Sequence, residues 1–391
     1  MGVRAGAGVT AMGTQGNLLG QILDYANRAD PYPLYAELRK TPVLRAPNGS
    51  YVVSTYREII ALIHDPRVSN RGGADGGSFI GMDPPEHDRL RRVATSHFDQ
   101  SDTVRPKLER IVTGLIDQMH GRRQIDIVDD LAYPYPVTVI CEQLGVPHED
   151  EPRFHPWAEA VITRLDPRPG HQDTAARAQS EMDQYMSGLI ERFRANPGPG
   201  LLSGLAAEEG MATEDIVNTG RLLLIAGHET TVNLIANGML TLLRHPHLLD
   251  RLRGDADLAV PLVEELLRYE PPVQLVPGAN VALADIEVAG TTIPKDARIV
   301  LALAAANRDP HRFADPDQFD PDRQDNQHLG FFSGIHYCFG AALARQEVQV
   351  ALAELARRLE NPRLLEDPPP YRQNPILRGP RHLPVQIDGV S

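Results

Sequence analysis

The first candidate for chemistry is Cys338, one of only two cysteines among the 391 residues of the chain. It lies in the segment FFSGIHYCFGAALAR, between Gly334 and Gly340, and an Ala/Leu-rich helix is predicted to follow at once. A helix N-terminus lowers the pKa of a nearby thiol, and flanking glycines let backbone N–H groups approach the sulfur. Zinc ligation is excluded because no second Cys or His pair has ligand spacing, and c-type haem is excluded because C-x-x-C-H is absent. A catalytic thiol with a histidine and a thiolate ligand of haem iron both remain open.

The second candidate is an acid and an alcohol at the centre of the apolar segment LLLIAGHETTVNLIANGMLTLL. The segment is long enough to span a membrane, but His228 and Glu229 are costly in lipid, which favours a core helix. A glutamate buried among Leu, Ile and Ala is expensive unless it has a function. Gly227 weakens the helix, and Thr230 can donate a hydrogen bond to the carbonyl of Ala226, so the helix could open beside a small ligand. We therefore predict a functional site at this place.

Two further patterns are weak when each is considered alone. Glu265 and Arg268 in VEELLRYEPP stand at i, i+3, a spacing at which most pairs are surface salt bridges of little energetic value. Arg323, at the end of FDPDR, is no stronger as a signal.

A predicted helix after two prolines, in MDPPEHDRLRRVATSHF, carries several basic side chains. His87 and Arg91 stand one turn apart on one face, and both can donate to an anion. Arg89 and Arg92 lie elsewhere on the same helix. On a chain with a net charge of −13, this basic cluster indicates an anionic partner.

Together and in this order, these motifs resemble those of the cytochrome P-450 family, in its soluble bacterial branch, from about Asp30 to the C-terminus. The haem-ligand loop of that family is matched by Phe331, Gly334, His336, Cys338 and Gly340. Its oxygen-binding helix is matched by Ala226, Gly227, Glu229 and Thr230. Its structural triad corresponds to Glu265, Arg268 and Arg323. Its residues that bind the haem propionates correspond to His87 and Arg91.

The resemblance implies a cytochrome P-450 fold, mainly α-helical with a small β region. It implies haem b as cofactor, with the Cys338 thiolate as axial ligand of the iron. It also implies a monooxygenase that inserts one oxygen atom of O₂ into a lipophilic small molecule, by hydroxylation or epoxidation. Thr230 is then expected to hydrogen-bond the activated oxygen, and Glu229 to link Thr230 to solvent. Ferredoxin and ferredoxin reductase are the implied electron donors.

Two residues depart from the pattern of the family. Phe332 replaces the first glycine of the haem-ligand loop. Asn280, in NVALADIE, stands where the family usually has an arginine that binds a propionate, and the chain has no arginine between Arg268 and Arg298. We therefore expect the haem to be held less tightly here than in relatives with the arginine, or to sit in more than one orientation.

Other functions stay open within and outside the family. Oxidative coupling or dehydration would use the same cofactor, and a non-catalytic haem-thiolate ligand sensor is the alternative from another class. The Glu229–Thr230 pair argues against a sensor, which would not need proton delivery, and against peroxide-driven relatives, which typically lack this pair. The predicted substrate pocket is lined by mostly apolar or small residues and favours a greasy substrate; these residues are 72–79, 224–226 and 273–277.

The elements that must position these residues can be predicted from periodicity and turn signals. We expect a short helix that begins near Pro31, a hairpin that turns at Asn48-Gly49, and a mainly helical chain from Thr55 to about His245. Short strands are expected between residues 271 and 300, irregular chain over 307–333, and a helix over about 340–359. Residues 1–20 are expected to form a disordered tail, and residues 21–391 a single haem-thiolate domain.

Composition limits the classes of partner and the location. The acidic net charge argues against nucleic acid as a partner. Two cysteines fit a reducing cytoplasm, and the Gly/Ala-rich start lacks the apolar core of a signal peptide, so we expect a cytoplasmic protein without a membrane anchor. Only three of the 39 basic residues are lysine, a bias that indicates GC-rich codons and an actinomycete-like bacterium.

Overall fold

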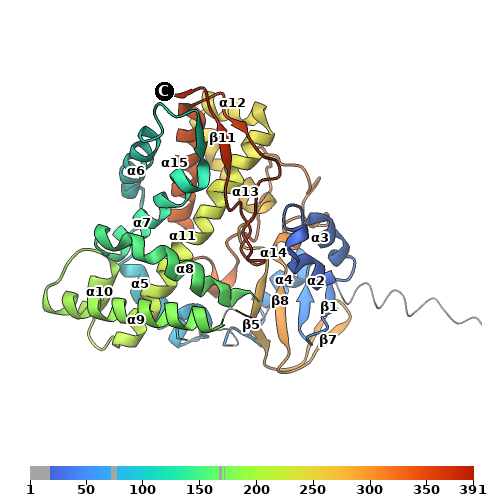
Figure 1. The fold of residues 1–391 in the computed structure, drawn as a ribbon. Coiled ribbons are helices and arrows are strands. Elements are labelled where there is room, and N and C mark those ends of the chain that lie inside the picture. Colours follow the sequence, from blue (N-terminus) through green and yellow to red (C-terminus); the bar gives the residue numbers. More distant parts are fainter. Residues whose placement is uncertain (1–17, 72–76, 167–169, 171) are drawn as a thin grey trace, which may run out of the picture.

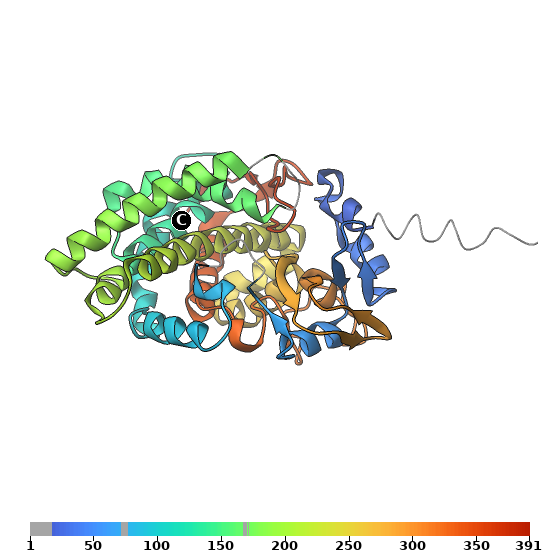
Figure 2. The same cartoon turned by 90° about the horizontal axis from the view of Figure 1, so that it is seen from below.

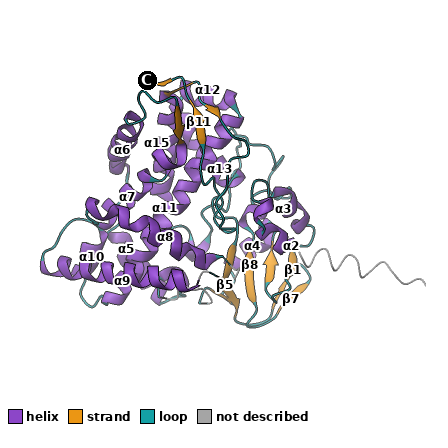
Figure 3. Cartoon of the chain, in the orientation of Figure 1, coloured by secondary structure: helices purple, strands orange, loops and turns teal. Residues whose placement is uncertain are grey.

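Helices dominate the protein, whose structure is a computed structural model that describes residues 18–71, 77–166, 170 and 172–391. Most of them gather on one side of the molecule, and the largest sheet lies on the other side with the short helices near the N-terminus (Figures 1 and 3). The helices are α2 (Leu18–Leu23), α3 (Tyr32–Arg39), α4 (Tyr56–Ile63), α5 (Glu86–Ser96), α6 (Arg105–Asp117), α7 (Pro134–Leu144), α8 (Phe154–Ile162), α9 (Gln172–Ala195), α10 (Leu201–Ala207), α11 (Thr213–Arg244), α12 (Pro246–Gly254), α13 (Ala259–Tyr269), α14 (Leu303–Ala306) and α15 (Ala341–Arg358).

The strands are short and belong to one larger sheet and three small ones. They are β1 (Val43–Arg45), β2 (Tyr51–Val53), β3 (Val68–Ser69), β4 (Gln124–Asp126), β5 (Val276–Ala282), β6 (Ile286–Val288), β7 (Thr291–Ile293), β8 (Arg298–Leu301), β9 (Leu359–Glu360), β10 (Arg363–Leu364), β11 (Pro384–Gln386) and β12 (Gly389–Val390). The larger sheet has the order β1-β2-β8-β5-β3, and in it only β2 and β8 are parallel. The prediction of a mainly α fold with a small β region is confirmed.

The central element is α11, which is buried on nearly all sides. Its 32 residues span roughly 48 Å at the usual rise per residue. It packs against α7, α9 and α15, and Figure 2 shows it running lengthwise through the molecule beside α9. A helix that other helices surround on nearly all sides lies in a core, so the choice of a core helix over a membrane span is confirmed. Among the described residues, we find no helix that combines the length and the apolar character needed to cross a bilayer.

The local predictions are largely confirmed, with one boundary corrected. The hairpin forms between β1 and β2, and Gly49 takes the positive φ of 85° that its turn requires. The tail predicted for residues 1–20 is too long, because α2 begins at Leu18 and buries Leu18 and Leu19. The apolar side chains of α2 pack with those of α3, an arrangement that a purely local pattern does not show. Residues 1–17 of the predicted tail lie outside the described residues.

Candidate active site

The middle of α11 is partly accessible, and we infer a hollow beside it. Ala226 is exposed and Thr230 is half-buried, although the turns of α11 on either side are buried. The two residues stand one turn apart and therefore share a face. The Thr230 hydroxyl donates to the carbonyl oxygen of Ala226 over 2.9 Å, as predicted, so its oxygen remains free to accept a hydrogen bond from the hollow. An exposed patch inside a buried helix marks a space that a ligand can fill.

Gly227 does not share that face. A Cβ atom at this position would lie 2.8 Å from the Ile140 side chain of α7. Because α7 and α11 pack against each other here, the glycine permits their close approach. The structure thus gives Gly227 a packing role, whereas the sequence suggested a role at the ligand.

Cys338 lies in a tight loop that leads into α15. The backbone N–H of Cys338 donates to the carbonyl of Phe331 over 2.9 Å, and Gly334 supplies a left-handed residue with φ 65°. Burial raises the pKa of the Cys338 thiol, while the N–H of Gly340 and the charge of Arg91 act in the opposite direction. The Gly340 N–H and the charge of Arg91 favour the thiolate but do not outweigh the effect of burial on the pKa. A metal cation bound to the sulfur would stabilise the thiolate further.

Phe332 takes a backbone conformation that suits glycine. Its φ is 62°, in the left-handed region where an L-residue is strained by about 1–2 kcal/mol. The side chain packs against the apolar cluster that includes Leu329 and Leu62, and this packing offsets part of the strain. The fold therefore keeps the geometry expected at this point of the loop although the glycine is absent.

Three buried polar atoms have no hydrogen-bond partner among the described residues at the predicted propionate sites. They are Nε2 of His87, Nε2 of His336 and Nδ2 of Asn280. The rings of His87 and His336 lie 4.7 Å apart between centroids. Burial, with the charges of His87 and Arg91, lowers the pKa of His336 to about 4. These buried atoms lack partners, and their surroundings disfavour further positive charge. Both features fit the binding of an anion such as a propionate.

The hydrogen bonds of His87 and Arg91 define how they could hold an anion. His87 Nδ1 lies 2.8 Å from the Asp88 carboxylate, which can only accept, so Nδ1 carries a hydrogen. Its Nε2 can then donate once the ring is protonated. Arg91 donates from Nη2 to the carbonyl of Tyr337 over 2.5 Å and so reaches the Cys338 loop from α5.

The basic cluster predicted on α5 is smaller than the sequence suggested. Arg91 turns toward the Cys338 loop, and its guanidinium lies 5.7 Å from the centroid of the Phe339 ring. Arg89 is exposed but pairs with Asp215 over 3.0 Å. Arg92 is exposed. The three arginines therefore do not act as one surface patch, because helix periodicity and a partner from α11 separate them.

The pair judged weak in the sequence is fully buried. Glu265 and Arg268 are both 0% exposed in their side chains and form two hydrogen bonds of 2.7 and 2.8 Å. Arg323 joins with its Nε 3.3 Å from both carboxylate oxygens of Glu265. Arg268 also donates to carbonyl oxygens of the irregular segment that precedes the Cys338 loop. The triad ties α13 to that segment and so helps to position the loop.

Glu229 is buried beside the hollow and is only 3% exposed. Its carboxylate lies 3.3 Å from Nε2 of His228 and 3.4 Å from Nη1 of Arg372. Burial alone would raise the pKa of Glu229, but the proton of His228 and the charges of His228 and Arg372 lower it to about 2. No sequence pattern indicated Arg372, because it is far from Glu229 along the chain and stands in no motif.

The predicted substrate lining is only partly described. Residues 72–76 of the Gly72–Phe79 loop lie outside the described residues. Phe79 is buried, with its ring 5.5 Å from that of Phe339 beside Cys338. Leu224 is fully buried, whereas Ala226 is exposed, so the two ends of the predicted 224–226 segment face different surroundings.

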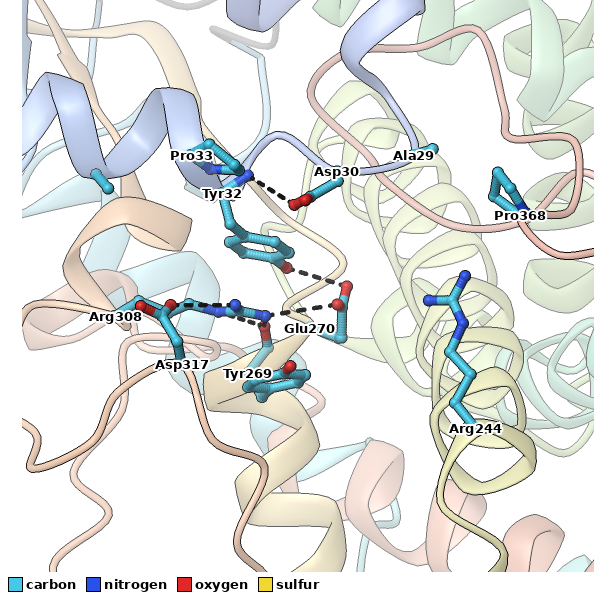
Figure 4. A pocket seen from close by; sticks show the side chains of 11 residues that line it. Ala29, Asp30, Tyr32, Pro33, Arg244, Tyr269, Glu270, Arg308, Asp317 and Pro368 are labelled. Carbon is cyan, nitrogen blue, oxygen red and sulfur yellow. Dashed lines mark hydrogen bonds and ion pairs between the residues drawn. The ribbon is translucent and has the colours of Figure 1, made fainter.

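A pocket of about 590 Å³ lies apart from these residues, between α3, α13 and the chain around Arg308 (Figure 4). None of the predicted site residues lines it. Its charged groups pair with one another: Arg308 lies 3.5 Å from Glu270, which accepts a hydrogen bond from Tyr32. Arg308 is stacked between the rings of Tyr32 and Tyr269. These contacts fix the packing of α3 against α13.

Comparisons with known proteins agree with this geometry. The family model described as Cytochrome P450 matches residues 157–383, which is more than half of the chain. The chain belongs to the cytochrome P450 family. Cytochrome P450 monooxygenase PikC of Streptomyces venezuelae is 39% identical, over 94% of this chain and 92% of that protein. The vitamin D(3) 25-hydroxylase of Pseudonocardia autotrophica is 36% identical, over 92% and 94%. The ligand-free crystal structure of Mycobacterium smegmatis CYP164A2 is similar, with a TM-score of 0.89, 39% identity, and coverage of 95% of this chain and 100% of that one.

Membership of this family establishes the type of enzyme and of cofactor. The protein is a cytochrome P450 monooxygenase. It works with haem, whose iron has a cysteine thiolate as axial ligand, and it requires O₂, a source of electrons and a substrate. The cytochrome P450 fold predicted from the motifs is confirmed.

Proposed function

We propose that this cytochrome P450 inserts one oxygen atom of O₂ into a lipophilic small molecule, by hydroxylation or epoxidation. The observation that carries the proposal is the hollow beside α11, which has the free oxygen of Thr230 at its wall and the buried acid Glu229 next to it. An enzyme that adds oxygen needs a controlled proton supply at this point. A ligand sensor does not, so the pair favours monooxygenation over that alternative.

We assign Cys338 as the axial thiolate ligand. The other cysteine, Cys141, is buried in α7, and burial and nearby carboxylates raise the pKa of its thiol, so it is a poor ligand. When bound, the haem supplies the oxygen-activating redox chemistry, and electron donation from a thiolate favours O–O cleavage.

Propionates of the haem would be held by the unpartnered buried atoms of His87, His336 and Asn280, together with Arg91. His87 and Arg91 come from α5, and Asn280 comes from β5. Phe331 contributes by its carbonyl, which holds the N–H of Cys338, and Gly340 contributes its N–H near the sulfur. Gly334 shapes the loop through its left-handed backbone.

The residues of the chain itself would position the substrate and move protons. Thr230 would accept a proton from the side of Glu229 and donate it into the hollow. Glu229 stays ionised at rest because the charges of His228 and Arg372 surround it, so it can receive a proton from solvent. The mostly apolar or small residues predicted to line the pocket would exclude bulk water and favour a greasy substrate.

The electron donors are proposed to be a ferredoxin and its reductase. Arg92 is exposed on α5, and Ile335 and Tyr337 are exposed on the Cys338 loop. The hydrogen bond from Arg91 to Tyr337 links α5 to this loop. A mixed basic and apolar surface near the cysteine suits an acidic electron-transfer protein. The cytoplasmic location and the absence of a nucleic-acid partner stay predictions from composition.

The proposal can be tested with purified, haem-loaded protein. Carbon monoxide added to the reduced protein should give the red-shifted Soret band of thiolate ligation. Vitamin D3, the substrate named for one relative, and a panel of steroids, terpenoids and polyketides should then be screened for the spectral shift that follows displacement of iron-bound water.

For a converted compound, the reaction should be repeated under ¹⁸O₂ with ferredoxin, ferredoxin reductase and NADPH. One ¹⁸O atom is expected in the product. A coupled or dehydrated product without ¹⁸O would instead establish oxidative coupling or dehydration, and spectral binding without any turnover across the panel would favour the ligand sensor.

A further inference from the structure

Five buried polar atoms without a hydrogen-bond partner among the described residues come from side chains that gather behind Glu229. They are Tyr133 Oη, His155 Nδ1, His228 Nε2, Glu229 Oε1 and Arg372 Nε. We call these five residues the polar cluster. They come from four parts of the fold: the turn before α7, α8, α11 and the segment after β10. A buried polar atom that stays unpaired destabilises the fold, so such a group of atoms calls for an explanation.

Contacts between the side chains link the polar cluster into a row. The centroids of the Tyr133 and His155 rings lie 4.2 Å apart, and those of Tyr133 and His228 lie 6.1 Å apart. His228 Nε2 lies 3.3 Å from Glu229 Oε1, and Arg372 Nη1 lies 3.4 Å from Glu229 Oε2. The row therefore leads from Glu229 through His228 and Tyr133 to His155.

Nε2 of His228 and Oε1 of Glu229 lie 3.3 Å apart and form no hydrogen bond in this arrangement. His228 Nδ1 lies 2.6 Å from the carbonyl of Leu224, which can only accept, so Nδ1 carries a hydrogen. If the ring were neutral, Nε2 would present a lone pair to a carboxylate oxygen 3.3 Å away, and the two acceptors would repel each other. A proton on either atom removes this repulsion, and the separation of 3.3 Å makes its transfer from one atom to the other a short step.

The far end of the row reaches solvent. The side chains of His155 and Glu159, one turn apart on α8, are each 38% exposed, and His155 Nε2 lies 3.8 Å from Glu159. Arg381, also exposed, pairs with the same Glu159. His155 thus has one nitrogen facing a surface carboxylate and the other, Nδ1, buried and unpartnered within the row.

The inner end of the row reaches the hollow around α11. Successive residues of an α-helix are rotated by about 100°. Thr230, which faces the hollow, is therefore followed around the helix by Glu229 and then by His228, which faces α7 and α8. The side chains of His228, Glu229 and Thr230 therefore follow one another around α11, from its outer side to the hollow.

We propose that the polar cluster is the route by which protons travel from solvent to Thr230, entering at His155 and Glu159 and crossing α11 through His228 and Glu229. Water molecules held by Tyr133 and Arg372 complete the row, since buried polar atoms that lack protein partners are the places where internal water binds. The inference rests on the proposed function, which requires proton delivery at Thr230.

The route accounts for every proton that the proposed reaction consumes. The proposed reaction consumes two protons and two electrons for each O₂, because one oxygen atom enters the product and the other leaves as water. A proton leaves Nε2 of His228 for Oε1 of Glu229, which passes it to the Thr230 oxygen while the Thr230 hydroxyl releases its own proton into the hollow. His228 then regains a proton from His155 through the bridging water, and His155 regains one from solvent. No residue is oxidised or reduced, and each broken bond to hydrogen is replaced.

The test uses haem-loaded Tyr133→Phe, which removes only the hydroxyl, and Tyr133→Phe/His155→Gln, which also removes a side chain able to carry a proton. His148→Gln is the matched control, because His148 pairs with Glu151 at the surface outside the polar cluster. Thr230→Ala is assayed beside them. Haem content, the reduced CO spectrum and substrate affinity should be the same in all variants of the polar cluster as in the wild type.

With the panel compound that the wild type converts best, the double variant should form at least about tenfold less product per NADPH, with hydrogen peroxide in its place. The solvent deuterium isotope effect on product formation should increase, a change that loss of a purely structural contact would not cause. His148→Gln should match the wild type. In a high-resolution crystal structure of the haem-loaded protein, water should contact Tyr133 Oη and Glu229 Oε1.

Suppose that the double variant forms as much product per NADPH as the wild type, with the same isotope effect, while Thr230→Ala diverts electrons to peroxide. This result would overturn the route and leave the proposed function standing. Full coupling in Thr230→Ala would instead remove the role of Thr230 and with it the need for the route. A polar cluster without ordered water in the crystal would also overturn the proposal.

Discussion

Asn280 offers a quantitative test of how the cofactor is held. Its side chain lies in β5, is 2% exposed and leaves Nδ2 without a partner among the described residues. A neutral hydrogen bond from this amide to a propionate contributes about 0.5–1.5 kcal/mol, whereas a charged one contributes about 1.5–3 kcal/mol. Replacing the amide by a guanidinium should therefore stabilise the bound haem.

The expected change in haem dissociation follows from these energies. The difference between a charged and a neutral hydrogen bond is about 1–1.5 kcal/mol, so Asn280→Arg should slow haem loss about five- to tenfold if the gain falls on the off-rate. Asn280→Ala removes the donor and should speed haem loss by about two- to tenfold. The opposite signs of the two effects separate hydrogen bonding from general disturbance of the strand.

Transfer of haem to an excess of an apo-haem-protein acceptor, followed in the Soret band, measures these rates directly. Asn196→Arg, at an exposed position, controls for the added charge. Circular dichroism should confirm an intact fold in each variant. If transfer from Asn280→Arg is as fast as from the wild type, and Asn280→Ala is also unchanged, the amide does not face a propionate and the reasoning is wrong.

Further predictions concern the ligand, proton delivery, stability and docking. Cys338→Ala should lose the red-shifted Soret band of the reduced CO complex, and an unchanged band would exclude Cys338 as the ligand. Thr230→Ala should still bind haem and substrate but divert much of the NADPH to hydrogen peroxide, with product formation reduced by about 10²–10⁴-fold. Glu265→Gln leaves Arg268 and Arg323 buried without their counter-charge and should lower the free energy of unfolding by about 3–5 kcal/mol in urea titrations; a loss below about 1 kcal/mol would contradict this. Charge reversal at Arg89 and Arg92 should raise the ferredoxin KM and weaken its dependence on salt, mainly through Arg92, because Arg89 already pairs with Asp215. Unchanged reduction by ferredoxin in the double reversal would place the docking surface elsewhere.

The strain at Phe332 shows how packing can replace a local preference. Its φ of 62° would suit glycine, yet the chain adopts it because neighbouring elements hold both ends of the loop. The Phe331 carbonyl binds the N–H of Cys338, and the N–H of Phe332 donates to Leu329. The loop geometry is thus set by its hydrogen bonds and contacts as well as by its glycines.

Local features of this protein could be predicted because short-range physics decides them. The hydrogen bond from Thr230 to Ala226 links residues four apart in one helix, so helix geometry alone requires it. The Asn48-Gly49 turn, the helix after the Cys338 loop and the buried position of Glu229 follow in the same way from turn preference, periodicity and an apolar sequence. The order of such motifs was enough to predict the fold and the cofactor.

The environment of individual charged side chains depended on the tertiary structure. Glu265 and Arg268 have the spacing of a surface pair, but Arg323, more than 50 residues further along, joins them in the core. Arg372 reaches Glu229 from the far end of the chain, where the sequence around it shows no motif. Whether a charge is buried, paired or free depends on which distant segments pack beside it. That arrangement depends on contacts across the whole core, so no short stretch of sequence determines it by itself.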